Sequence, residues 1–185
     1  MQPQADERRP VVLALDLARR MGWAEGHPGD VPRVGSVELA REGASHAAIH
    51  GGMIKWLGTR LLAFPPSAIV YEAPIPPPHM RGKTNFNTTR VLLGLSGVVE
   101  GVCFCKGVHN LTEASVGDVR MHLLGRRPPA ATAKQQVIAR VRMLGVDTKD
   151  PDAADAAALW FYQTSIMYPR WARALDTPLF RKGSR

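Results

Sequence analysis

Clustered and periodic apolar positions divide the chain into short strands and longer helices. Apolar runs rich in leucine and β-branched residues predict strands at residues 11–18, 22–26, 33–39, 67–74 and 108–114. Apolar residues spaced three and four apart predict helices at 45–63, 91–107, 115–125 and 150–168, and a basic loop leading into a helix at 126–145. Two adjacent glycines, Gly51 and Gly52, weaken the prediction of the first helix.

The order of these elements predicts an α/β protein with a mixed sheet. The first three strands follow one another directly, which favours a meander, whereas the later strands alternate with helices. The chain has 185 residues, enough for one well-formed domain. We therefore expect a flexible polar segment at residues 1–10, one domain at 11–168 and a basic, mostly irregular tail at 169–185.

Four carboxylates lie where an acid is costly or hard to explain. Asp16 interrupts the first apolar strand, and Glu72 closes the fourth. Asp152 and Asp155 are three residues apart in the last helix, so they share one side of it. Each has an ordinary explanation: a turn former, a surface acid, and capping residues behind the N-cap Asp150. Asp155, however, lies one turn too late to cap the helix.

As a set, the four acids favour a metal site. The net charge is +8, so the protein has few acids to spend in apolar surroundings. Burying several carboxylates together is expensive unless cations neutralise them. Mg²⁺ prefers oxygen ligands, and two ions roughly 3.5–4 Å apart can activate a water and stabilise the leaving oxygen of a phosphodiester. An acidic centre on a basic protein is typical of a nuclease.

Four segments give the sequence a resemblance to a known family. VLALDLARRMGWA, IVYEAP, ATAKQQVIARV and DPDAADAAALW occur in the order and spacing of the RuvC-type Holliday-junction resolvases of the ribonuclease-H-like superfamily. The resemblance covers the chain from Val11 to about Tyr168. It implies a ribonuclease-H-like fold, with a five-stranded mixed sheet of three antiparallel meander strands and two parallel strands, flanked by helices.

The resemblance also implies a site and an activity. Asp16, Glu72, Asp152 and Asp155 would bind two Mg²⁺ ions, for which Mn²⁺ substitutes, and Lys134 would approach the scissile phosphate. The implied enzyme is a crossover junction endodeoxyribonuclease, which resolves four-way junctions and other branched DNA by two-metal hydrolysis. Symmetric cutting needs two active sites in a fixed relation, so we expect a homodimer. The apolar segment 91–105 is either its interface or an ordinary core helix.

Some residues depart from the family pattern. Leu17 and Ala18 follow the first aspartate where the cellular enzymes usually have Pro-Gly, and SVGDVRMH offers Gly117 and Arg120 where a second lysine often lies. These departures fit a divergent, phage- or prophage-derived member. Two alternatives stay open: a related nuclease acting on flaps, forks or RNA–DNA hybrids, and a noncatalytic junction-binding protein. The presence of all four acids argues against the second.

Basic residues around the motifs are candidates for contacts with the DNA backbone, which supply most sequence-independent affinity. A charged loop with one aromatic residue resembles an element for splayed strands, although a solvated loop is an equal alternative. The predicted DNA-binding residues are Arg19, Arg20, Arg81, Lys83, Phe86, Arg90, Arg126, Arg127 and Lys134.

The cysteines and the apolar runs bear on localisation. Cys103 and Cys105 are two apart in a helical segment and point in different directions, which predicts neither a disulfide nor a zinc pair. Reduced cysteines and the lack of a signal peptide predict a cytoplasmic protein. The longest apolar run, 91–105, is interrupted by Glu100 and too short to span a bilayer, so we expect no membrane association.

Overall fold

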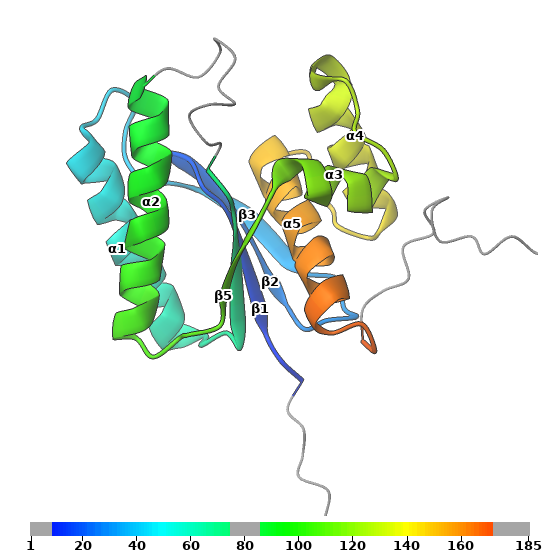
Figure 1. The fold of residues 1–185 in the computed structure, drawn as a ribbon, viewed down its shortest axis with the longest axis horizontal. Coiled ribbons are helices and arrows are strands. Elements are labelled where there is room, and N and C mark those ends of the chain that lie inside the picture. The colour runs from blue at the N-terminus through cyan, green and yellow to red at the C-terminus, as the bar shows by residue number, and fades with distance from the viewer. Residues whose placement is uncertain (1–8, 75–85, 172–185) are drawn as a thin grey trace, which may run out of the picture.

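The computed structural model describes residues 9–74 and 86–171. The elements are β1 (Val12–Asp16), β2 (Arg20–Gly26), β3 (Arg33–Glu38), α1 (His46–Ala63), β4 (Ala68–Glu72), α2 (Phe86–Cys105), β5 (Leu111–Ala114), α3 (Val116–Leu124), α4 (Ala130–Met143) and α5 (Pro151–Met167). Figure 1 shows α1 and α2 on one face of the sheet and α3, α4 and α5 on the other. The predicted domain limits, 11–168, stay a prediction.

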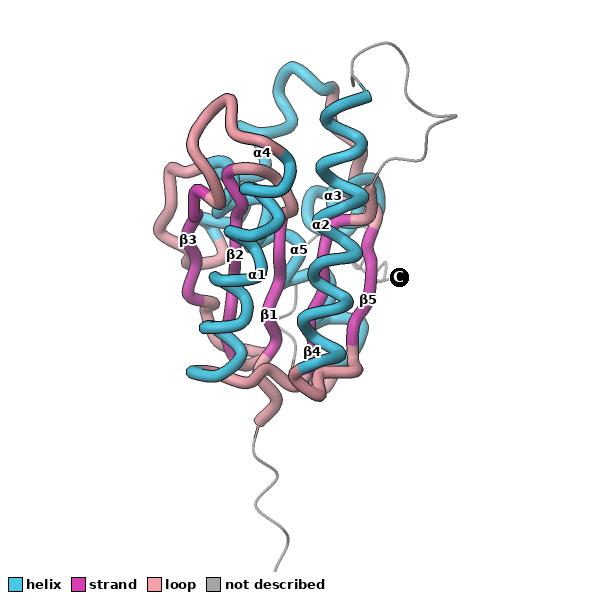
Figure 2. The backbone as a smooth tube through the Cα atoms, turned by 90° about the vertical axis from the view of Figure 1, so that its left-hand side faces the viewer, coloured by secondary structure: helices cyan, strands magenta, loops and turns pink. Residues whose placement is uncertain are grey.

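The five strands form one mixed sheet in the order β3-β2-β1-β4-β5. β1, β2 and β3 pair as an antiparallel meander, whereas β4 lies parallel to β1 and β5 parallel to β4. Figure 2 shows the strands side by side behind α1 and α2. The α/β prediction, with three antiparallel meander strands and two parallel ones, is confirmed.

The alternation of side chains along β1 divides the interior into two cores. Leu13 and Leu15 face α1 and α2, where they pack in one buried cluster. Val12 and Ala14 point the other way, into a second cluster beneath α3, α4 and α5. Since side chains two residues apart share a face of the sheet, Asp16 continues the row of Val12 and Ala14 toward α5.

Helix α5 lies close against the sheet because the residues that face it are small. Five alanines of its first two turns are at most 1% exposed: Ala153, Ala154, Ala156, Ala157 and Ala158. On the sheet side, a Cβ at Gly22 would come within 1.9 Å of the carbonyl oxygen of Asp152. Further along, the indole Nε1 of Trp160 donates a hydrogen bond to the carbonyl oxygen of Val12 at 3.0 Å. The helix is therefore fixed to the sheet at both of these points.

The opposite face is covered by α1 and α2. Of the two glycines that weaken the first helix pattern, Gly52 has a packing reason, because a Cβ there would meet the carbonyl oxygen of Leu39 at 2.0 Å. Helix α2 begins at Phe86, five residues before the predicted start, and at 20 residues it has the length and composition of a membrane span. Its inner side nevertheless belongs to the core, and Glu100 accepts a hydrogen bond from the Tyr71 hydroxyl at 2.7 Å.

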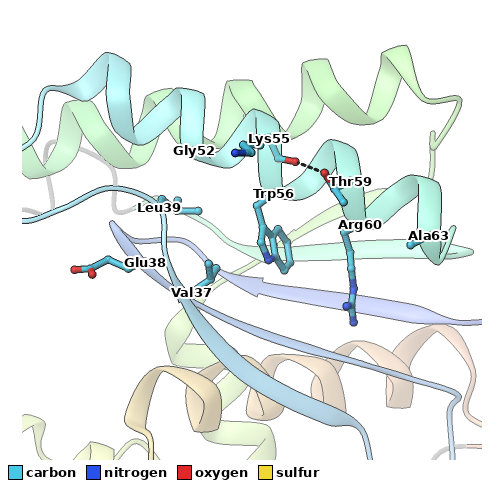
Figure 3. Close-up of a pocket in the computed structure, with 9 residues that line it drawn as sticks. All are labelled: Val37, Glu38, Leu39, Gly52, Lys55, Trp56, Thr59, Arg60 and Ala63. Atoms are coloured by element: carbon cyan, nitrogen blue, oxygen red, sulfur yellow. Dashed lines mark hydrogen bonds between the residues drawn. The ribbon is translucent and has the colours of Figure 1, made fainter.

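A cavity of about 450 Å³ lies between β3 and α1. Figure 3 shows Trp56 and Arg60 projecting from α1 toward the sheet beside it. Arg60 forms an ion pair with the buried Glu25 and stacks 4.7 Å above the ring of Trp23. The cavity is on the α1 side of the sheet, and none of the four candidate metal ligands lines it.

Candidate active site

Asp16 and Glu72 end two neighbouring parallel strands. The register pairs Leu15 with Tyr71, so the next residue on each strand places these two acids side by side. Val70, two residues before Glu72, lies in the core beneath α5, and Glu72 therefore shares that face with Asp16. Both residues are half-buried, and Figure 1 shows that the strand β1 ends at the side of the sheet where α5 begins.

Asp152 and Asp155 reach the same place from the first turns of α5. The helix begins as its sequence predicts, with Asp150 accepting a hydrogen bond from the Asp152 backbone N–H at 3.0 Å and Pro151 in the first turn. Gly22 pairs with Asp16 across the β1–β2 ladder and touches the Asp152 backbone. That contact brings the start of α5 directly over the end of β1.

The electrostatics show that the acids act on one another. Burial, followed by the charges of Glu72, Asp155 and Asp152, raises the pKa of Asp16 to about 8. Burial and the Asp155 charge raise the pKa of Glu72 to about 7. Burial also raises the pKa of Asp155. Carboxylates that repel one another in a poorly solvated place gain from any positive charge brought among them.

Two cations of the chain already oppose this repulsion. Lys134, from the first turns of α4, holds its Nζ 3.9 Å from Oδ1 of Asp152. The charges of Lys134 and of Arg120 on α3 both lower the pKa values of Glu72 and Asp155 against the effect of burial. The lysine predicted to approach a substrate phosphate is therefore beside the acids, and a second cation lies near enough to act on them.

Four carboxylates are an oxygen donor set of the kind that Mg²⁺ binds, and their mutual repulsion fits a divalent cation. Within residues 9–74 and 86–171, however, no three Asp, Glu, His or Cys side chains are already gathered into an arrangement that could hold a metal ion. One carboxylate oxygen of Asp152 is also occupied by Arg20. The acids thus form an open cluster rather than a finished set of ligands, and metal binding stays a prediction.

The predicted DNA-binding residues fall into three groups. Arg81 and Lys83 lie outside the described residues. Phe86 and Arg90 are exposed in the first turns of α2, Phe86 at 77%.

The remaining arginines already have partners within the protein. Arg126 donates to the Gln136 side chain at 2.9 Å, and Arg127 lies 3.7 Å from Asp118. Arg19 forms an ion pair with Glu38, and Arg20 forms ion pairs with Asp150 and with Asp152 of the acid cluster. Whether any of these residues contacts DNA stays a prediction.

Residues outside the predicted set also shape the site. Gly22 permits the close approach of α5, and the sequence carries no signal for this, because its neighbours Met21 and Trp23 are ordinary strand residues. Ser36 and Asp150 both hold Arg20, and the contact with Asp150 spans 130 residues of sequence, so no local pattern predicts it. His122, by contrast, is hydrogen-bonded at 3.1 Å to Ser165 near the far end of α5, away from the acids.

Comparison with known proteins identifies the fold. No protein-family model and no curated protein sequence matches the chain. Among solved structures, Thermus thermophilus RuvC in complex with a Holliday junction substrate has a TM-score of 0.64 and 18% identity, covering 87% of this chain and 95% of that one.

Two further solved structures agree. A second structure of Thermus thermophilus RuvC has a TM-score of 0.64 and 21% identity, over 86% of this chain and 95% of that one. The yeast mitochondrial Holliday junction resolvase Ydc2 has a TM-score of 0.53 and 13% identity, over 80% and 76%. The chain therefore has the RuvC-type, ribonuclease-H-like fold that the four sequence segments predicted.

Proposed function

We propose that this protein is a Mg²⁺-dependent, structure-selective endonuclease that cuts four-way junctions and other branched DNA. The observation that carries the proposal is the meeting of Asp16, Glu72, Asp152 and Asp155 at one end of the sheet, where burial and the neighbouring carboxylates raise the pKa values of Asp16, Glu72 and Asp155. The fold supports it, because the similar solved structures include a RuvC bound to a Holliday junction and a Holliday junction resolvase.

The four acids would hold the metal ions, and Mn²⁺ would substitute for Mg²⁺. When bound, the ions would supply an activated water and charge stabilisation for the leaving oxygen. The chain itself supplies fixed cations: Lys134 and Arg120 flank the acids and can stabilise negative charge that develops on a phosphate. Their positions make the cluster selective for a phosphodiester that lies across the ends of β1 and β4.

Symmetric cutting of a four-way junction requires a homodimer, and we propose the outer side of α1 and α2 as its interface. Four large apolar side chains are half or more exposed there: Ile54 at 51%, Leu62 at 71%, Leu93 at 51% and Phe104 at 74%. A groove of about 500 Å³ runs between the two helices. Since exposed apolar patches often mark protein–protein contacts, a second copy is the occupant that the proposed function favours.

A cleavage assay on a panel of labelled DNA structures tests the proposal. Four-way junctions should be cut in the presence of Mg²⁺ or Mn²⁺ and remain intact with a chelator, whereas linear duplex should be cut poorly. Equal cutting of a flap, a fork or an RNA–DNA hybrid would instead assign a related nuclease with another substrate. Junction binding without cleavage under any metal condition would assign a noncatalytic binding protein.

A further inference from the structure

Arg20, the first residue of β2, makes several hydrogen bonds to side chains at the start of α5. Its guanidinium donates to both oxygens of Asp150, at 3.0 Å from Nη1 and 2.6 Å from Nη2. Nη2 also donates to the Ser36 hydroxyl at 2.7 Å, and Nη1 donates to Oδ2 of Asp152. One side chain thus joins β2, β3 and α5.

The contact with Asp150 fixes the helix itself. Asp150 caps α5 through the Asp152 backbone N–H, and the Ser36 hydroxyl donates to its Oδ2 at 2.6 Å. The ion pair with Arg20 and these hydrogen bonds hold the Asp150 carboxylate in place at the N-terminus of α5. The N-terminal turn that carries the site aspartates is therefore tied to two strands of the sheet.

The two oxygens of the Asp152 carboxylate have different partners. Oδ2 is taken by Arg20, while Oδ1 lies 3.9 Å from Lys134, on the side of the other acids. A partner that holds one oxygen of a carboxylate fixes the direction of the other oxygen. Outer partners orient metal ligands in this way. The neighbouring Arg19 points elsewhere, to Glu38 and to the carbonyl oxygen of Ala40 at 2.8 Å.

We propose that Arg20 is a positioning residue of the active site rather than a contact to DNA. It fastens the first turn of α5 to the sheet and presents Oδ1 of Asp152 to a divalent cation. A lysine cannot replace it, because only the planar guanidinium fork reaches Asp150, Asp152 and Ser36 together. The inference rests on the proposed function for the identity of the cation, and on the geometry alone for the role of Arg20.

Mn²⁺ binding to the full chain, followed by electron paramagnetic resonance without DNA, tests this role. Arg20→Gln should weaken binding about tenfold or more, as loss of an outer partner of a metal ligand typically does. Arg20→Lys should recover only part of that loss. Arg19→Gln removes the same charge one residue away and should leave Mn²⁺ binding unchanged. Ser36→Ala, a milder change in the same network, should weaken binding by less and covers the case in which Arg20→Gln fails to fold.

A double-mutant comparison separates positioning from general loosening. In an Asp152→Asn background, Arg20→Gln should change the Mn²⁺ affinity little, because the carboxylate that it orients is gone. Tighter or unchanged binding in Arg20→Gln, an equal loss in Arg19→Gln, or an undiminished effect in the Asp152→Asn background would each overturn the role of Arg20. A native chain that binds no Mn²⁺ would contradict the proposed function itself, which is a different result.

Discussion

The Cα of Gly22 lies so close to the backbone of Asp152 that a Cβ at position 22 would approach the Asp152 carbonyl oxygen to 1.9 Å. Gly22 also pairs with Asp16, so one glycine touches both the strand and the helix of the acid cluster. The separation between the Asp16 and Asp152 carboxylates therefore depends on the absence of a side chain at position 22.

Gly22→Ala should push the start of α5 away from the sheet. We expect the free energy of unfolding to fall by about 1–3 kcal/mol, which is typical of overpacking. The cleavage rate should fall by a larger proportion than the free energy of unfolding. Gly51→Ala is the matched control, because a Cβ there meets nothing within 4 Å and an alanine in a helix should stabilise by about 0.5–1 kcal/mol. Thermal melts of the two variants should shift in opposite directions.

Asp16→Asn should abolish cleavage of a four-way junction and retain binding to it. The asparagine amide keeps the shape of the side chain but removes the negative charge that a metal ion bound at the cluster would need. Gel-shift binding without metal and cleavage with Mg²⁺, measured on the same preparation, check both halves. Full cleavage by this variant would remove the basis for the metal site.

The stability of the metal-free protein should fall as pH rises from about 4 to about 8. The pKa of Asp16 is about 8 in the folded chain against an ordinary 3.8, so in this range the folded state binds a proton that the unfolded state has lost. Glu72, with a pKa of about 7, acts in the same direction over a narrower range. The melting temperature at pH 8 should therefore lie below that at pH 5.5.

Two further measurements identify the source of that slope. Asp16→Asn should flatten it and raise the melting temperature at pH 8; a gain of about 1–2 kcal/mol corresponds to roughly 2–8 °C in a chain of this size. Mn²⁺ should stabilise the native chain more at pH 8 than at pH 5.5, because the carboxylates must lose their protons to bind it. An identical pH slope in the variant would assign the effect to other groups.

Lys134→Ala should reduce cleavage by about a hundredfold, the usual cost of removing a fixed charge that stabilises a transition state. Its Nζ is 3.9 Å from Asp152, yet its side chain is 60% exposed, so folding should be little affected. Arg142→Ala, which removes an exposed cation from the last turn of the same helix, serves as the control for net charge. Equal losses in the two variants would point to a general effect on DNA affinity.

Leu93→Asp should convert the proposed dimer to monomers. Leu93 is already 51% exposed on α2, so an aspartate there should disturb an interface far more than the fold. Met143→Asp on α4 is the control, since Met143 is 77% exposed and lies on the other side of the sheet. Sedimentation equilibrium on the three chains should show a monomer for Leu93→Asp alone; a native chain that is monomeric would exclude this interface.

Local patterns were enough to predict the sheet and the four acids. The apolar strands and the spacing in DPDAADAAALW are properties of short segments, and the four acids point to a metal site once they are considered as a set. Arg20 differs, because its role depends on Asp150, which is 130 residues away. In sequence it resembles Arg19, and only the three-dimensional contacts separate the two.

The start of α2 was missed for a related reason. Residues 86–90, FNTTR, carry no apolar periodicity, so the pattern predicts a loop there, whereas in the structure they form the beginning of α2. β2 likewise begins at Arg20, because Arg20 pairs with Glu38 and extends the meander. Both errors concern element ends, where a tertiary contact decides what a short polar segment does.

The placement of α5 has a consequence for synthesis of the protein in a cell. Asp16 and Glu72 are synthesised before α5, the helix that completes the cluster and shields β1 and β2. A nascent or truncated chain that lacks α5 has neither the second pair of acids nor a cover for its core. Any activity that needs all four acids would therefore begin only once α5 has been made.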